Sequence, residues 1–195
     1  SLLFEKLDYT ILWVTRSTLK NDIWKNMFNW ICDHQIRDRI EKGENIPENP
    51  SSIRHYLKKK FINPISYKQL SNALNKKGDV YKKLVNFNGE EDFLKNTFII
   101  IDEAHKLYST DLTGIEKPDT DAIEKSVFNS YKVSGKNSCK LLLMTATPIA
   151  DDPMEFVKLM NLLIGNPNMR FTTIYKDFVK EYMNKKFNFS YIGIN

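Results

Sequence analysis

Three short runs of apolar residues stand out along the chain, and none of them alternates with polar residues. They are TILWVT (10–15), TFIIID (97–102) and KLLLMT (140–145). Continuous apolar runs of this length are typical of strands covered on both faces, as in a parallel sheet flanked by helices. A weaker fourth run, KFINPIS (60–66), contains Pro64, so we expect only a short strand there.

Helical periodicity occupies the segments between these runs. Apolar residues recur every three or four positions from Leu19 to Ile31, and Ser17 or Thr18 is the candidate N-cap. Segment 120–131 carries a similar stripe, made by Ile123, Val127, Phe128 and Tyr131. Segments 37–52 and 109–121 hold Pro, Gly and charged residues, which predicts surface loops. Strands that alternate with helices indicate the α/β class.

The clearest helix signal is DDPMEFVKLMNLLIGN. Asp152 suits the N-cap, Pro153 the first helical position and Glu155 a bond back to the cap, and Gly165 predicts the end. The predicted apolar face consists of Phe156, Val157, Met160 and Leu163.

Composition narrows the class of protein. The 195 residues carry a net charge of +5, which is compatible with a phosphate-rich partner but also with an ordinary lysine-rich surface. The two cysteines, Cys32 and Cys139, lie far apart, which argues against a disulfide framework or a zinc site and favours a reducing compartment. No apolar run approaches the roughly 20 residues that span a bilayer, and no signal peptide is evident.

Polar clusters follow all three confident strands, as TRSTLKND, DEAHK and TATPIADD. In parallel sheets the carboxyl ends of strands share one edge, where ligands bind. Asp102, at the end of an apolar strand, can hold Mg²⁺ through water while the metal bridges nucleotide phosphates. Glu103 can then orient and polarise an attacking water, and His105 can reach the neighbouring strand. The threonines of MTATPI (144–149) offer hydroxyls there.

IIIDEAHK followed by LLLMTATPI resembles motifs II and III of the superfamily 2 helicases and nucleic-acid-dependent ATPases. By the same resemblance, ILWVTRSTLKNDIW is similar to motif Ia, and ISYKQLSNAL (65–74) is placed like the next motif that contacts the nucleic-acid backbone. TATPIADDPMEFVKLMNLL is similar to the Swi2/Snf2-like branch. The phrasing also resembles ATPases of large DNA viruses, such as the poxvirus nucleoside triphosphatases and early transcription factor ATPase.

The resemblance implies a RecA-like parallel sheet with ATP and Mg²⁺ as ligands. Asp102 would position Mg²⁺, Glu103 would be the catalytic base, and His105 would couple the nucleotide to the Thr145–Ala146–Thr147 segment. The implied contacts to nucleic acid, DNA rather than RNA, come from Thr15, Arg16, Ser17 and Lys20. Such backbone contacts are salt-sensitive and largely independent of sequence.

One expected motif is absent from the sequence. The phosphate-binding loop G-x-x-x-x-G-K-[ST] does not occur, and the single Gly-Lys step, Gly135-Lys136, reads as a turn. We expect this loop upstream of residue 1 and the arginine finger of a second RecA-like domain downstream of residue 195. Residues 1–165 would then be a partial first RecA-like domain and 166–195 a connector or elaboration, inactive towards ATP in isolation.

Three functions fit this reading. The first is an ATP-dependent helicase or translocase, viral and linked to transcription, with no membrane association. It would be cytoplasmic, in a viral factory or the virion, if viral and nuclear otherwise. The second is a helicase-like binding subunit of a transcription assembly whose ATPase site has decayed, although an intact DEAH argues against it. The third is the motor subunit of a restriction-type nuclease.

Overall fold

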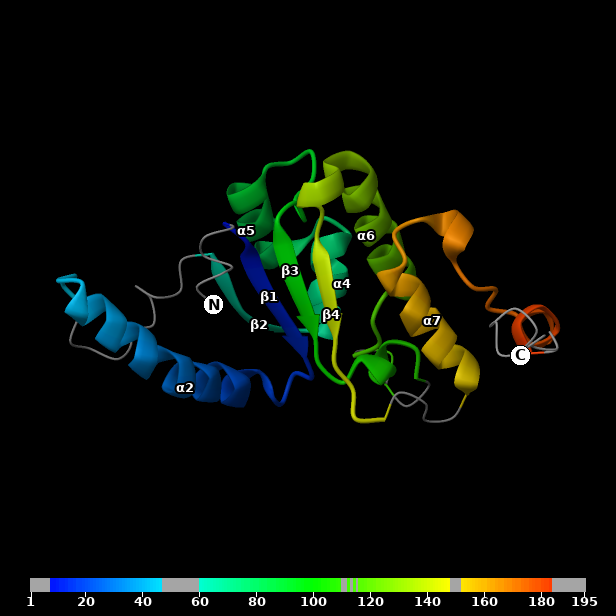
Figure 1. Ribbon diagram of the computed structural model, residues 1–195, viewed down its shortest axis with the longest axis horizontal. Helices are drawn as coiled ribbons and strands as arrows, with labels where there is room; N and C mark the ends of the chain where they lie inside the picture. The colour runs from blue at the N-terminus through cyan, green and yellow to red at the C-terminus, as the bar shows by residue number, and fades with distance from the viewer. Residues whose placement is uncertain are drawn as a thin grey trace, which may run out of the picture.

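Within the part of the chain that the structure describes, four parallel strands form one sheet in the order β2-β1-β3-β4 (Figure 1). The strands are β1 (Thr10–Thr15), β2 (Phe61–Ser66), β3 (Thr97–Ile101) and β4 (Lys140–Leu143). This computed structural model describes residues 8–46, 60–109, 112, 114, 116–147 and 152–183, without the side chains of 27–35. The three confident strands predicted from the sequence are confirmed, with β3 and β4 ending slightly earlier than expected.

Helices connect and cover these strands, which confirms the α/β class and the RecA-like parallel sheet. They are α2 (Lys20–Glu41), α4 (Tyr67–Leu74), α5 (Gly78–Asn88), α6 (Thr120–Ser134), α7 (Pro153–Leu163) and α8 (Tyr175–Phe178). Short helical turns add η1 (Ala104–Leu107), η2 (Gly135–Asn137), η3 (Pro167–Met169) and η4 (Val179–Met183). The Gly135-Lys136 step lies in η2, at the end of α6, so its reading as a turn is confirmed.

The two faces of the sheet are covered unequally. On one face, Leu12, Val14, Ile99 and Ile101 are buried in one core with residues of α4, α5 and α6; Figure 1 shows α4 and α5 behind the strands and α6 beside β4. Side chains alternate along a strand, so Trp13, Phe98 and Leu142 belong to the other face. There α2 packs on β2, with the Trp24 and Phe61 ring centroids 6.0 Å apart, but Leu142 in β4 stays 40% exposed. The expectation of full cover on both faces is therefore met on one face only within the described residues.

Strand β2 is longer than its proline suggested. Leu12 pairs with Ile62 and Val14 pairs with Ile65, so Asn63 and Pro64 together oppose the single residue between Leu12 and Val14. A bulge of this kind absorbs a residue that cannot donate to the ladder. Because β2 lies at an edge of the described sheet, Pro64 interrupts the pairing without ending the strand.

Helix α2 departs from prediction at both ends. Its N-cap is Leu19, with no side-chain cap, so the prediction of Ser17 or Thr18 is wrong. It continues to Glu41, which overturns the loop expected over residues 37–41; residues 47–52 lie outside the described part. The helix ends where Gly43 adopts a φ of +75°, a conformation that favours glycine.

Helix α7 has the predicted N-cap but presents a different face to the core. Asp152 is the N-cap and accepts a hydrogen bond from the Met154 amide at 2.9 Å, with Pro153 at the first position, while the bond from the Glu155 side chain back to the cap stays a prediction. The buried apolar residues are Met154, Val157, Leu159 and Leu162, whereas Phe156, Met160 and Leu163 are more than a third exposed. Only Val157 of the predicted face is correct, because several helical faces of this segment are apolar and packing against η1 and the core selected one.

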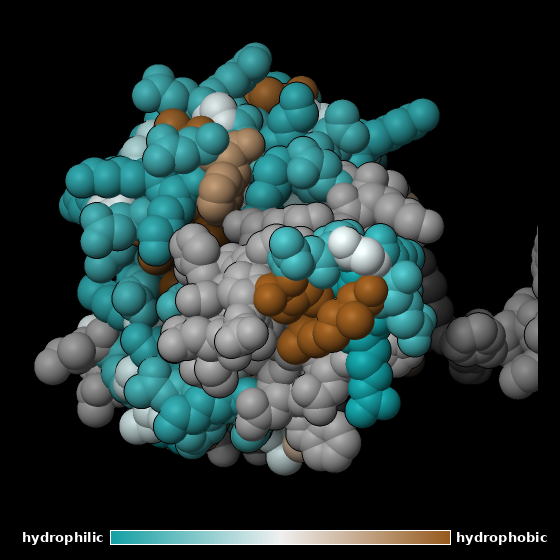
Figure 2. All heavy atoms as spheres, turned by 90° about the vertical axis from the view of Figure 1, so that its left-hand side faces the viewer, coloured by the Kyte–Doolittle hydropathy of each residue, from teal (hydrophilic) through white to brown (hydrophobic). Residues whose placement is uncertain are grey.

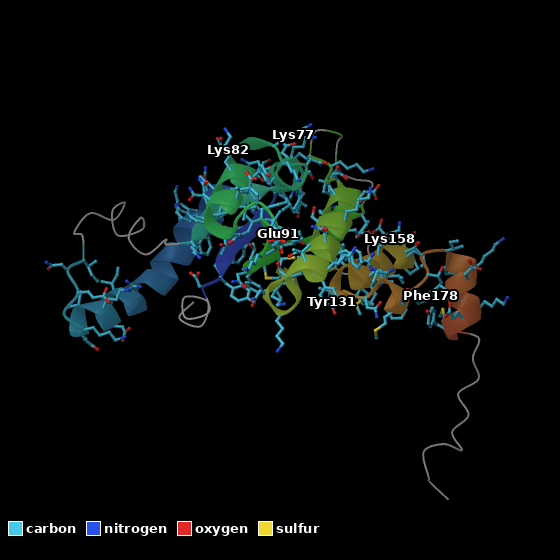
Figure 3. All side chains as sticks on the ribbon, turned by 90° about the horizontal axis from the view of Figure 1, so that it is seen from above. Lys77, Lys82, Glu91, Tyr131, Lys158 and Phe178 are labelled. Atoms are coloured by element: carbon cyan, nitrogen blue, oxygen red, sulfur yellow. The ribbon has the colours of Figure 1, made fainter. Side chains whose placement is uncertain are left out.

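The segment that follows α7 is held to that helix by hydrogen bonds. The Asn161 side chain donates to the Phe171 carbonyl (2.9 Å) and accepts from the Phe171 amide (2.8 Å). The rings of Phe171, Phe178 and Tyr182 then cluster, with centroids 5.1–6.3 Å apart. Figure 3 shows Phe178 on α8 beyond Lys158 of α7. The boundary predicted at residue 165 stays a prediction.

Charged side chains are spread over the surface. Figure 2, which faces the α2 end, shows a mainly hydrophilic surface with small apolar patches. Lys77 and Lys82 are exposed and lie near each other along the upper side of the molecule in Figure 3, away from Lys158. The net positive charge therefore does not by itself mark a binding face. No helix in the described part of the chain is long and apolar enough to cross a membrane.

Candidate functional site

The residues that follow β3 remain bonded to both neighbouring strands. The Asp102 amide donates to the Val14 carbonyl (2.9 Å), on the β1 side. Two residues on, the Ala104 amide donates to the Met144 carbonyl (2.8 Å), just past β4. The acid pair is thus held between strand ends and not on a free loop, which fixes the positions of Asp102 and Glu103 relative to the sheet.

Glu103 occupies a left-handed backbone conformation, with φ +50° and ψ +49°. This conformation costs a non-glycine residue about 1–2 kcal/mol. Such conformations persist where surrounding contacts enforce them, and they cluster at functional sites. Here the left-handed residue ends the strand and starts η1, so Asp102 and Glu103 present their carboxylates to one edge.

The Asp102 carboxylate is partly satisfied from within the chain. Its Oδ2 accepts a hydrogen bond from Thr15 Oγ1 (3.1 Å), and its Oδ1 accepts the Glu103 amide (3.1 Å). A carboxylate has about four lone-pair sites, so acceptor capacity remains. Among the described residues no group of three acids, histidines or cysteines could cage an ion. One carboxylate with oxygen capacity to spare suits Mg²⁺, which usually keeps its waters and binds through few protein ligands.

His105 lies at the centre of the contacts around the turn. Its side chain is 9% exposed, and Nδ1 lies 2.8 Å from Thr145 Oγ1 and 3.3 Å from Glu103 Oε2. The Glu103 side chain is 40% exposed, so its carboxylate reaches solvent while one oxygen contacts the histidine. A buried imidazole therefore joins the exposed acid to the end of the neighbouring strand.

The threonine segment after β4 meets this histidine through one residue. Thr145 is half-buried and its hydroxyl oxygen also accepts the Thr147 amide at 3.2 Å. Ala146 and Thr147 are exposed. The structure thus brings Thr145 into contact with His105, and Thr147 connects to it only through Thr145. Residues 148–151 lie outside the described residues.

The four residues predicted to touch nucleic acid fall into two environments. Thr15 is fully buried, and its hydroxyl is directed to Asp102. Arg16 and Ser17 are exposed, with Ser17 Oγ donating to Glu116 Oε1 at 2.6 Å. Lys20 begins α2, and its Nζ donates to Gln69 Oε1 at 3.1 Å. Thr15 therefore contacts the turn formed by residues 102–104, which we call the acid turn. The other three residues lie on the outer surface next to it.

Sequence reasoning did not single out Tyr67, which contacts the acid turn directly. Its hydroxyl lies 2.6 Å from the Asp102 carbonyl and 3.3 Å from the Glu103 carbonyl. Burial and the negative charges of Asp102 and Glu103 raise the pKa of Tyr67 well above its usual range. The available signal was a tyrosine directly after a strand, within a segment already compared with a backbone-contacting motif.

Comparison with known proteins gives two matches. The model of the SNF2-related domain family matches residues 4–188. A protein of Acanthamoeba polyphaga mimivirus named "Putative ATP-dependent RNA helicase R563" is 30% identical over an aligned length of 149 residues. That alignment covers 69% of this chain and 24% of the viral protein, so the chain spans about a quarter of that relative. No solved structure matches the chain.

Proposed function

Because the chain belongs to the SNF2-related domain family, we propose that its parent protein is an ATP-dependent motor that unwinds or tracks along nucleic acid. The observation that carries the proposal is the contact of His105 with both Glu103 and Thr145 at the carboxyl edge of the sheet. It connects an acid suited to hydrolysis with a second strand end. A structural change at Glu103 would therefore alter the end of β4, and the reverse also holds.

Asp102 is the residue that would hold Mg²⁺. When bound, this ion would supply positive charge that offsets the negative charge developing during phosphoryl transfer. The chain's own contribution is orientation: the Thr15 hydroxyl holds one carboxylate oxygen and the Glu103 amide holds the other, so the remaining acceptor sites point in a fixed direction. Thr15, predicted as a phosphate contact, is better proposed as a residue that positions Asp102.

Glu103 would act on the attacking water. A carboxylate that is 40% exposed can accept a hydrogen bond from water, and contact with a buried histidine limits its rotamers. His105 is held in turn by Thr145, and the exposed Ala146 and Thr147 follow on the outer surface. We assign Thr145, Ala146 and Thr147 to coupling, since with His105 they join Glu103 to a surface that a second domain or nucleic acid can reach.

Arg16, Ser17 and Lys20 supply the proposed contact to a nucleic-acid backbone. They lie at the end of β1 and the start of α2, next to Thr15 and hence to Asp102. A cation and a hydroxyl suit phosphate oxygens, and binding of this type carries no base identity. Loss of Arg16 is expected to weaken binding to all sequences alike and to reduce its dependence on salt.

The proposal also needs a phosphate-binding loop. Among the described strands β4 has a neighbour on one side only, and Leu142 in it is 40% exposed. That edge can accept a further parallel strand, and a strand that carries the loop would bring it close to Asp102. The viral origin, the role in transcription and the preference for DNA remain proposals drawn from sequence resemblance.

The test is ATP hydrolysis by the full-length parent, titrated with single-stranded DNA, duplex DNA and RNA. We expect one polymer to stimulate turnover strongly, and Glu103→Gln to remove about 100-fold or more of the stimulated rate. Nucleotide binding by that variant should persist, which separates lost chemistry from lost folding. Absence of hydrolysis with every polymer would overturn the motor and favour a binding subunit whose site has decayed.

A further inference from the structure

We propose that the Tyr67 hydroxyl positions the acid turn and connects it to the side of the domain that carries Arg16, Ser17 and Lys20. The proposal rests on the function proposed above. Tyr67 is the first residue of α4, directly after β2, and only 2% of it is exposed. Its ring belongs to the core, while its hydroxyl reaches out of the core to the backbone of the turn.

The contact meets a specific need of this turn. The Asp102 amide donates to the Val14 carbonyl in β1, and the Ala104 amide donates to the Met144 carbonyl just past β4. The Glu103 carbonyl accepts the Lys106 amide at 2.9 Å, within η1. Within the described part of the chain, the bond that satisfies the Asp102 carbonyl comes from Tyr67, at 2.6 Å. Without it, a carbonyl beside the left-handed residue would have to find another partner or turn outwards.

The Tyr67 hydroxyl donates from the first residue of α4 to the Asp102 carbonyl, so it forms a direct hydrogen bond from α4 to the turn. This hydrogen bond holds the backbone next to Glu103 in place, so a small shift of α4 would change the orientation of the Glu103 carboxylate.

The same end of α4 touches the proposed nucleic-acid surface. Ser66 and Gln69 form a capping box, in which each side chain bonds the other residue's backbone amide. Gln69 Oε1 also accepts from Lys20 Nζ at 3.1 Å, at the start of α2. One helical turn thus contacts Lys20 on one side and the acid turn on the other. A phosphate that draws Lys20 away from Gln69 would release α4 and, through Tyr67, act on Glu103.

The test compares Tyr67→Phe with Tyr108→Phe in the full-length parent. Tyr108 is a fitting control because it follows the same turn, is half-buried and donates its hydroxyl to Glu124 (3.0 Å) instead of to the acid turn. The readouts are kcat and KM for ATP, the Kd for nucleic acid, and the hydrogen-exchange rates of the Glu103 and Ala104 amides.

For Tyr67→Phe we expect kcat to fall about tenfold or more, because the water-activating acid is displaced, with KM and Kd within about twofold of wild type. Exchange at Ala104 should accelerate about tenfold, as its bond to the Met144 carbonyl opens more often. Tyr108→Phe should leave kcat and both exchange rates within about twofold of wild type.

Two results would overturn the positioning role: unchanged kcat and exchange in Tyr67→Phe, or an equal loss of kcat in Tyr108→Phe. The exchange measurement needs no catalysis, so it judges the contact even if the wild-type parent hydrolyses no ATP. In that case the motor fails as a function while the Tyr67 contact is still decided by the exchange rates.

Discussion

At the amino end of the sheet, Asp92 is 5% exposed, and its Oδ2 accepts hydrogen bonds from Ser130 (2.7 Å) and Ser134 (2.5 Å) of α6. Its Oδ1 accepts the Leu94 amide at 3.0 Å. At the carboxyl end, Asp102 is also held by a hydroxyl and an amide, yet it is only partly buried.

The difference between these two acids separates structure from chemistry. Asp92 is enclosed by hydrogen-bond donors from α6 and from its own loop. Its carboxylate therefore links α6 to the segment just before β3. Asp102 keeps acceptor capacity towards solvent, and its neighbour Glu103 is 40% exposed in a left-handed turn. A hydrogen-bonded carboxylate is therefore not enough to indicate a functional site. A carboxylate with free acceptor positions, on a backbone held in a constrained conformation, is the better indicator.

The largest expected effect comes from making the same change at each acid. Asp102→Asn should lower kcat about 100-fold, because the metal loses its charged ligand, with little loss of stability. Asp92→Asn should lower the free energy of unfolding by about 2 kcal/mol, because hydrogen bonds to a buried charge are lost. Steady-state kinetics and urea denaturation of the parent measure the two. If Asp92→Asn abolished turnover while stability stayed intact, the contrast between the two ends would be wrong.

A smaller effect is expected from one threonine at each end. Thr145→Val removes the hydroxyl that contacts His105 and accepts the Thr147 amide, so stimulation by nucleic acid should fall about tenfold. Thr10→Val removes a buried hydroxyl that donates to Asn88 Oδ1 (3.2 Å) and should cost about 1 kcal/mol of stability instead. The ratio of stimulated to basal ATPase measures the first, and thermal unfolding the second. Equal stimulation ratios in both variants would count against the coupling role.

A third acid, Asp119, sharpens the comparison because it is exposed and caps α6. The Ala122 amide and the Asn75 side chain, both 3.0 Å away, hold the pKa of Asp119 below its usual range. The depressed pKa means that its stabilisation is complete above about pH 4 and is lost as the pH falls through the folded-state value. Asp119→Ala should cost about 1 kcal/mol at pH 7 and less at pH 3, measured by urea denaturation. A cost that does not change with pH would show that the charge is not used.

The smallest effect concerns Cys139, which lies at the amino end of the sheet, directly before β4. Its amide donates to Ser130 Oγ (3.0 Å), and burial raises the pKa of its thiol to about 11. At pH 8 only about one thousandth of the thiol would be ionised, so alkylation should be slow in the native protein and rapid in urea. Peptide mass spectrometry that follows Cys139 itself provides the measurement. Rapid native labelling would mean that this end opens readily.

The sequence by itself determined the strands and the acids. Uninterrupted apolar runs predicted β1, β3 and β4, and the rule that parallel strands end at one edge predicted that Asp102, Glu103 and His105 lie near Thr145. These features are local, because a run of Ile and Leu sets a buried strand and adjacency along the chain sets which residues follow it.

Only the tertiary structure decided which partners these residues have. The burial of Thr15 against Asp102, the reach of Tyr67 to the acid turn and the exposed face of α7 all join segments far apart in the chain. Several faces of α7 were equally apolar in sequence, and a tyrosine after a strand can turn towards the core or towards solvent. Packing chose between these alternatives, because side chains must fill space and satisfy buried polar groups together, and no single segment encodes that sum.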